Sequence, residues 1–452
     1  MGSELRDSLN SVTIKNWPHS LSGVSPIRRR IHAGPPTVCG KGTCGRQLHG
    51  TSLILWTTGD RVRAADIIRL KGDFELAQGQ REQALATFQR ALAILEKLGD
   101  HEETGVILSA MANDVTNQGK FDRGEQLYRE SKSQFEQAGD RARVAVAIIH
   151  LGNFSYLRGD LRAASKLYRQ SLEIQSSLDH PNLGEVLARL SDVELLLGHA
   201  PDARQYAQRA VEAYRPIQGD YEQLTKAMTN LGEALEAEGD LQGARQQFQA
   251  ALEIQQKIGN VILVAESEEE LADVAMEEGR ADQAEPLLRT AIAEFEKDQG
   301  DPDLVSAYAE LGRALLMEGK IEESDQAVQH AEKLGRTFTD LSLKLAIATY
   351  RARIQLAKAT QSKDTAELVK VHRELNTIIA AASKSGYYGA ECEARLVLGE
   401  LEMHLKPFQG RADLAALASE ARSRGLEAVA RRAEQATHIQ NGATTSDGRP
   451  QM

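Results

Sequence analysis

The stretch LGNFSYLRGDLRAASKLYRQSL, residues 151–172, returns in altered form along most of this chain. In it, Gly159 is followed by the small Ala164 and then by the aromatic Tyr168. The same order of residue types appears in LGEALEAEGDLQGARQQFQAAL, residues 231–252. Self-similarity at a fixed spacing is typical of architectures that stack one supersecondary unit many times. The sequence therefore predicts a repeat protein before it predicts any chemistry.

The spacing of one glycine gives the length of the repeat. Glycines expected to end the first helix of each unit recur at intervals of 40, 40, 39, 41, 40 and 40 residues, at Gly79, Gly119, Gly159, Gly198, Gly239, Gly279 and Gly319. Five residues after each glycine comes a small side chain, and a mostly large one follows four residues later. Two helices approach closely only where side chains are small, and the bulky neighbour fills the remaining space. We therefore expect an all-α, right-handed α-solenoid of stacked antiparallel helix pairs.

Helix boundaries are marked by Gly-Asp pairs. Gly99-Asp100 and Gly139-Asp140 place a glycine where one helix ends and an aspartate where the next helix needs an N-cap. Asp100 with Glu103 matches the spacing of a capping box. Each unit is thus expected to hold two helices joined by tight turns.

The chain divides into four parts by composition and pattern. Residues 1–60 hold four of the eleven prolines and both tryptophans without a helical period, so we expect a disordered leader. Residues 61–335 hold seven repeats. In residues 336–438 the pattern weakens, which predicts degenerate repeats and capping helices. Residues 439–452 are expected to be a disordered tail.

The repeat pattern resembles the tetratricopeptide repeat, with its Leu-Gly pairs at 151–152, 231–232 and 311–312. The period near 40 resembles the long-helix type found in kinesin light chains. This resemblance implies a concave groove, lined by the first helices, that binds a protein or peptide. We therefore expect a binding scaffold with an adaptor or sensor role.

The C-terminal part carries a second resemblance. The segments YYGAECEARLVLGELEM, residues 387–403, and ASEARSRGLEAVARRA, residues 418–433, resemble the C-terminal repeat region of large bacterial signalling proteins. In those proteins a serine/threonine kinase, winged-helix or cyclase-type domain precedes the repeats. The alternative function is therefore the regulatory C-terminal region of a bacterial signalling protein whose effector domain is missing from this chain.

Bulk properties and missing motifs narrow the function. A net charge of −11 argues against nucleic-acid binding, and no apolar run is long enough to cross a membrane. Only three cysteines fit a reducing compartment, so we expect a cytoplasmic protein. The chain contains no phosphate-binding glycine loop, no HExxH and no GxSxG. We expect neither an enzyme nor a cofactor.

The N-terminal part of the chain contains one group of candidate metal ligands. Cys39, Cys44, His32 and His49 are four residues of the types that hold zinc. Their spacing matches no zinc knuckle, so we favour two unrelated thiols and expect no metal.

Polar residues on the first helices are the candidate groove. Counting from the repeat glycines, the first half of the groove contains Asn113, His150, Asn153, Tyr156, Arg189, Lys226 and Asn230. Some tetratricopeptide proteins hold a partner's C-terminal carboxylate with lysine, asparagine and arginine, and these residue types occur here. Ile149 and Arg189 depart from that clamp. A general polar peptide groove and a solvated helix face are the other interpretations.

The second half of the candidate groove is acidic. Glu266, Glu270, Asp273 and Glu277 follow one another at i, i+4, i+7 and i+11, on one face of one helix, and Glu233 precedes them on the neighbouring first helix. Like charges at i, i+4 destabilise a helix by roughly 0.2–0.5 kcal/mol per pair. A groove that attracts basic segments of a partner explains this arrangement. A solvated face and a divalent-ion site are the alternatives.

Overall fold

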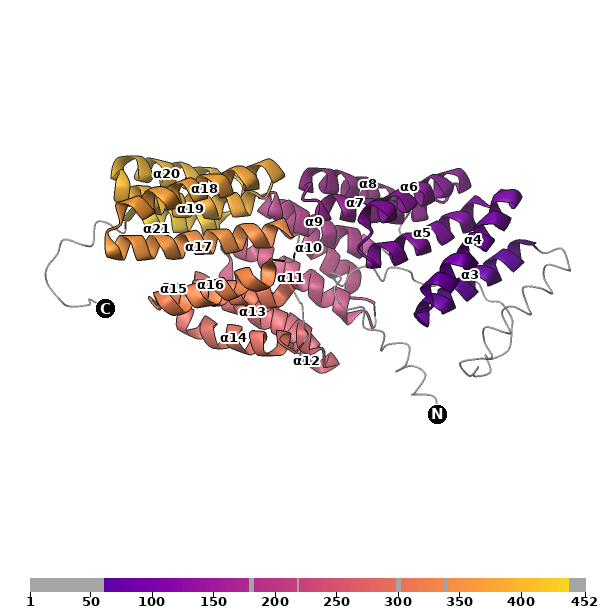
Figure 1. The fold of residues 1–452 in the computed structure, drawn as a ribbon, viewed down its shortest axis with the longest axis horizontal. Coiled ribbons are helices and arrows are strands. Elements are labelled where there is room, and N and C mark those ends of the chain that lie inside the picture. The colour runs from indigo at the N-terminus through magenta and orange to yellow at the C-terminus, as the bar shows by residue number, and fades with distance from the viewer. Residues whose placement is uncertain are drawn as a thin grey trace. The chain divides into compact units, whose positions relative to one another are not determined.

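A computed structural model describes residues 61–178, 183–217, 219–297, 302–336, 338 and 340–438. Within these ranges the chain forms nineteen helices and no strand (Figure 1). The predicted all-α solenoid of antiparallel helix pairs is confirmed. The expected leader and tail, and the thiols Cys39 and Cys44, lie outside the described residues.

The described chain separates into two compact units. Unit 1 holds the residues up to Phe154 together with those from Leu167 to the end of α8, and unit 2 holds Ser155–Lys166 and everything from Leu183 onward. The helices of the N-terminal part, including the two that straddle this division, are α3 (Arg61–Ala77), α4 (Arg81–Leu98), α5 (His101–Asn117), α6 (Phe121–Ala138), α7 (Arg141–Leu157) and α8 (Leu161–Ser176).

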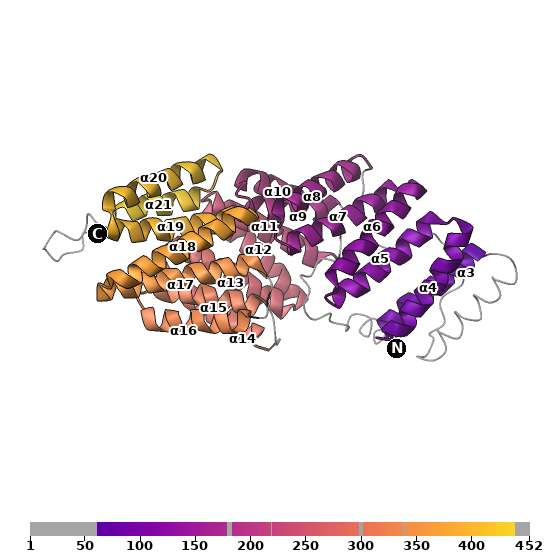
Figure 2. The same ribbon diagram turned by 45° about the horizontal axis from the view of Figure 1, so that its top comes forward.

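Unit 2 continues the helix pairs and adds the C-terminal helices. Its helices are α9 (Leu183–Leu196), α10 (Ala200–Tyr214), α11 (Tyr221–Ala237), α12 (Leu241–Ile258), α13 (Val261–Glu277), α14 (Ala281–Phe295), α15 (Pro302–Met317), α16 (Ile321–Gly335), α17 (Leu341–Ser362), α18 (Thr365–Ser385), α19 (Tyr388–Leu405), α20 (Pro407–Ser423) and α21 (Glu427–His438). The helices of each pair, such as α15–α16 and α19–α20, pack against each other and stack beside the next pair (Figure 2). Among the residues that the structure describes, no helix is both long and apolar enough to span a membrane.

The Gly-Asp pairs end and start helices as predicted. Gly99, after α4, has a φ of 66°, in the left-handed region that favours glycine. The Asp100 carboxylate accepts a hydrogen bond from the backbone N–H of Glu103 at 3.1 Å and so caps α5.

Small and large residues interlock inside each pair, as the repeat pattern predicts. Ala164 and Ala244 are fully buried. Gly152 of α7 lies directly under the Tyr168 ring of α8, because a Cβ built on Gly152 would stand only 2.4 Å from a ring carbon. The alternation of small and large positions therefore reflects close helix contact.

The first helices of the pairs in unit 2 form a row whose last member contacts its first. Helices α9, α11, α13, α15, α17 and α19 contact one another in succession, and α19 also contacts α9, while α21 contacts α11. The return is fixed by Tyr388, whose ring packs on Gly198, and by Arg424, which lies 3.8 Å over the Tyr388 ring and donates a hydrogen bond to the Leu197 carbonyl. The inward sides of these helices thus surround one interior.

Candidate functional site

Three candidate groove residues of unit 1 pack against the second helix of their own repeat or of the preceding one. The Tyr168 hydroxyl donates to Asn153 Oδ1 at 2.7 Å, and the Tyr128 hydroxyl donates to Asn113 Oδ1 in the same way. His150 stacks on the Tyr128 ring with ring centroids 4.3 Å apart. These side chains tie the second helix of a pair to the first helices around it.

Four further candidates lie at the start of unit 2. Tyr156 is half-buried near the end of α7. Asn230 of α11 donates from Nδ2 to the Ala188 carbonyl at 3.1 Å and to Asp192 of α9. Burial raises the pKa of Asp192, and the positive charges of Lys226 and Arg189 oppose that rise. The structure thus brings Arg189, Lys226 and Asn230 together around one carboxyl group.

The acidic candidates meet in the interior of unit 2. Burial, together with the charges of Asp192 and Glu236, raises the pKa of Glu233 to about 8. Burial and the charge of Glu277 raise the pKa of Glu236, which the sequence did not single out as a site residue, to about 7. Burial raises the pKa of Glu270 well above its ordinary value, with Glu233 and Asp273 adding to the shift. Carboxyl groups of α11 and α13 therefore face one another across the helix row.

Two arginines that sequence reasoning missed hold part of this cluster. Arg313 of α15 donates to Asp273 at 3.2 Å and to Glu277 at 2.5 Å. Arg432 of α21 lies 3.5 Å from Glu277 and pairs with Glu393 of α19. Glu277, with a side chain only 9% exposed, is thus bound by two cations of its own chain.

Within the residues that the structure describes, Glu233, Glu236 and Glu270 lack such cationic partners at ion-pair distance. Across the described part of the chain, the half-buried side chains of Glu233, Glu236 and Glu270 form no hydrogen bond or ion pair with another side chain. Glu266, the first member of the predicted stripe, is half-buried on α13 and has contacts of its own. The stripe predicted on α13 is therefore divided into a paired end, Asp273 and Glu277, and an unpaired part around Glu270.

One cluster has the residue types of a metal site. The ligand atoms of Glu194, His199 and Asp202 lie within 4.8 Å of one another. Glu194, almost fully buried, already accepts a hydrogen bond from Ser165 at 2.5 Å and contacts His199 Nδ1 at 2.7 Å. Both carboxylate oxygens are thus engaged within the protein, and we assign the cluster to the stability of the α9–α10 turn.

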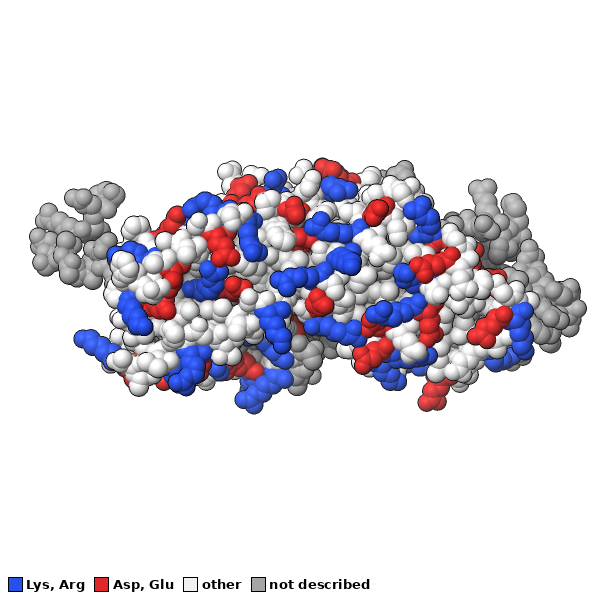
Figure 3. Space-filling view, turned by 90° about the horizontal axis from the view of Figure 1, so that it is seen from above, with Lys and Arg blue, Asp and Glu red and all other residues white. Residues whose placement is uncertain are grey.

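Charge on the outer surface is mixed. Figure 3 shows Lys and Arg interspersed with Asp and Glu across the face seen from above. Salt bridges within single helices, such as Arg129 with Glu125 on α6 and Arg289 with Glu285 on α14, also join opposite charges. The concentration of one sign of charge described above is a property of the interior of unit 2.

Comparison with known proteins agrees with the helix-pair architecture. The family model described as tetratricopeptide repeat matches residues 63–137, 140–215 and 189–257. No curated protein matches the chain in sequence. The predicted resemblance to the tetratricopeptide repeat is confirmed over these residues.

Solved structures share this fold over most of the chain. A Rap protein complexed with Competence and Sporulation Factor has a TM-score of 0.56 at 15% identity, covering 83% of this chain and 99% of that one. The Rap conjugation gene regulator of plasmid pLS20, in complex with the Phr* peptide, has a TM-score of 0.52 at 14% identity, covering 80% and 98%. The apo form of the quorum sensor NprR from B. thuringiensis has a TM-score of 0.52 at 9% identity, covering 81% and 99%. At these identities the likeness concerns the fold.

Proposed function

We propose that this chain is a non-catalytic regulatory scaffold that binds a peptide with basic side chains in the interior of unit 2. The observation that carries the proposal is the group of Glu233, Glu236 and Glu270, whose pKa values are raised by burial and by repulsion from neighbouring carboxylates. A lysine or arginine of a bound peptide relieves this repulsion and restores the ionised carboxylates.

The fold supports a peptide as the ligand. The pLS20 regulator was crystallised with a peptide, and its solenoid resembles this one over 80% of the present chain. The part of the interior around Arg189, Lys226 and Asn230 carries cationic and polar side chains, which can hydrogen-bond the carbonyls and amides of a peptide backbone. We place the protein in a bacterial signalling pathway in the cytoplasm, where peptide binding changes its contact with a second protein.

Charge reversal tests the proposal. The variants Glu270→Lys and Asp273→Lys are expected to weaken binding of short fluorescein-labelled lysine-rich peptides by at least about tenfold, which corresponds to ~1.4 kcal/mol. Fluorescence anisotropy measures the affinity. Glu253→Lys, the same change at an exposed position on α12, is the matched control and should bind as the parent does.

A second readout separates binding from general charge attraction. Because Glu233 has a pKa of about 8, a basic peptide that binds beside it at neutral pH should release protons. Calorimetry in buffers of different ionisation enthalpy measures this release. Equal affinity of parent and Glu270→Lys protein, or binding without proton release, overturns the assignment of the peptide to this interior.

A further inference from the structure

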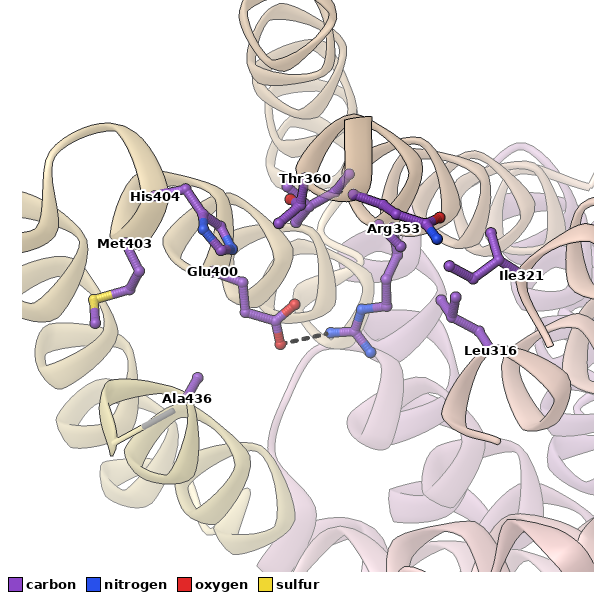
Figure 4. A pocket seen from close by; sticks show the side chains of 11 residues that line it. Leu316, Ile321, Arg353, Thr360, Glu400, Met403, His404 and Ala436 are labelled. Atoms are coloured by element: carbon purple, nitrogen blue, oxygen red, sulfur yellow. Dashed lines mark hydrogen bonds and ion pairs between the residues drawn. The ribbon is translucent and has the colours of Figure 1, made fainter. Parts of the chain in front are cut away.

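A cavity lies in the C-terminal part of unit 2, beyond the repeats matched by the family model. It has a volume of about 450 Å³ and is bounded by the α15–α16 turn, α17, α19 and α21 (Figure 4). Leu316, Ile321, Leu356 and Met403 form its apolar walls. Small-molecule sites are commonly cavities of roughly 300–1,000 Å³ with mostly apolar walls and a few polar groups.

Two opposite charges stand together in this cavity. Arg353 of α17 and Glu400 of α19 point toward each other in Figure 4, with guanidinium and carboxylate 3.4 Å apart. Their side chains are 22% and 27% exposed. At this separation the contact is a long one for a charge-assisted hydrogen bond, which is ordinarily about 2.7–2.9 Å. The ion pair is therefore a weak one, and both of its side chains are accessible from the cavity.

Further polar atoms of the cavity lining are unused. Neither Arg353 Nε nor Thr360 Oγ1 finds a hydrogen-bond partner among the described residues, although both atoms are buried. A buried donor without a partner costs about 1–3 kcal/mol. A ligand or ordered solvent that accepts from Arg353 and shifts its guanidinium would recover part of this cost.

We propose that this cavity binds a free α-amino acid with an apolar side chain. The ligand carboxylate pairs with Arg353, its ammonium group pairs with Glu400, and its side chain lies against Leu316, Ile321, Leu356 and Met403. Arg353 and Glu400 together carry no net charge, and a zwitterion is the ligand that satisfies both without leaving an unpaired buried charge. This site is separate from the acidic interior, and the inference does not rest on the proposed peptide binding.

The charge pattern disfavours simpler ligands. A fatty acid would place its carboxylate beside Glu400, and an alkylamine would place its ammonium group beside Arg353, so each would meet one repulsive contact. An uncharged apolar molecule would leave the pair unused. Of these four classes, the α-amino acid is the one that offers a partner to both Arg353 and Glu400.

Isothermal titration of the whole chain tests the inference. L-Leucine, L-methionine and L-phenylalanine are the probes, and at least one of them is expected to bind with 1:1 stoichiometry. Leucinamide lacks the carboxylate and N-acetyl-L-leucine lacks the ammonium group, so each should bind at least about tenfold more weakly than L-leucine, or ~1.4 kcal/mol. No heat and no thermal shift with any of the three amino acids overturns the proposal.

Two substitutions assign the partners. Glu400→Gln removes the ammonium partner, so this variant should bind N-acetyl-L-leucine as well as it binds L-leucine. Arg353→Gln removes the carboxylate partner, so this variant should no longer distinguish leucinamide from L-leucine. Retention of full discrimination by both variants contradicts the orientation and the site.

Matched controls separate the site from the fold. Arg351→Gln makes the same change on α17 at a residue that pairs with Glu332 and does not line the cavity, so binding should be unchanged. Ala357→Leu fills the cavity without touching either charge and should abolish binding while the thermal transition stays cooperative. If Arg353→Gln fails to fold, the Glu400→Gln and Ala357→Leu results still decide the question.

Discussion

At the scale of single residues, the repeat depends on glycines that have no room for a side chain. A Cβ on Gly232 would lie 2.4 Å from the Phe248 ring, which is fully buried in the same repeat. Overpacking a core contact costs about 1–3 kcal/mol, and alanine recovers up to about 1 kcal/mol in helix propensity. We therefore expect Gly232→Ala to lower the free energy of unfolding by roughly 1–2 kcal/mol in urea denaturation.

Gly389 provides the matched control for this prediction. It lies in the first turn of α19, and a Cβ built on it meets nothing within 4 Å. Gly389→Ala should leave stability unchanged or raise it slightly, because alanine favours the helix. Equal losses in the two variants would show that helix propensity and not ring contact governs these positions.

The same scale shows what residue patterns could predict. The sequence predicts the packing of the glycine, small and aromatic positions, because each of these contacts lies within one repeat and recurs in the next. The Asn113–Tyr128 and Asn153–Tyr168 hydrogen bonds recur at the same spacing, which was visible in the sequence but was interpreted as part of a groove. A residue type in a groove-facing register does not reveal whether a neighbouring helix already uses it.

At the scale of helices, Arg432 of α21 pairs with two carboxylates of the interior, and the neighbouring Arg431 donates to the Gly239 carbonyl. Burial raises the pKa of Glu393, but the charges of Arg432, Arg353 and Arg313 outweigh it and hold that pKa below its usual value. Arg432→Met leaves Glu393 and Glu277 with one cation fewer. Breaking a largely buried pair costs roughly 3–5 kcal/mol, and since the Arg432 side chain is 23% exposed we expect about 3 kcal/mol.

Hydrogen exchange of the α21 amides measures this effect where it arises. Arg422→Met is the control, because Arg422 pairs with Glu427 and Glu434 in exposed positions. Its effect on exchange should be much smaller than that of Arg432→Met. Unchanged protection of α21 in Arg432→Met would mean that apolar contacts alone dock this helix.

The contact of α21 with α13 also marks where sequence reasoning ended. Arg432 and Glu277 are far apart in the chain. Glu277 lies on a helix of the repeat region, whereas Arg432 lies on a C-terminal helix outside the repeats. No periodicity connects them, so the sequence predicted the acidic stripe but not the arginines that neutralise one end of it. The cavity around Arg353 could not be predicted for a related reason, since most of its lining comes from α17, α19 and α21, which lie outside the regular repeats.

At the scale of the whole molecule, the interior carboxyl groups determine how stability depends on pH. Glu233, with a pKa of about 8, and Glu236, with a pKa of about 7, bind protons more tightly in the folded protein than at their ordinary value of 4.5. Between about pH 4.5 and pH 8 the native state therefore holds more protons than the unfolded chain, and stability falls as pH rises. Carboxyl groups with lowered pKa values, such as Glu393, act in the opposite sense and lose their contribution in acid.

These opposing contributions predict maximal stability in mildly acidic solution, near pH 5–6. Urea denaturation across a pH series measures the curve, and the free energy of unfolding should decline steadily from pH 6 to pH 8. Glu233→Gln should flatten that decline, because it removes a carboxyl group whose pKa is raised to about 8, whereas Glu253→Gln on the exposed side of α12 should not. If stability in the parent protein stays constant or rises over this interval, the interior carboxylates are already ionised and compensated. The repulsion that the proposed peptide relieves would then be absent.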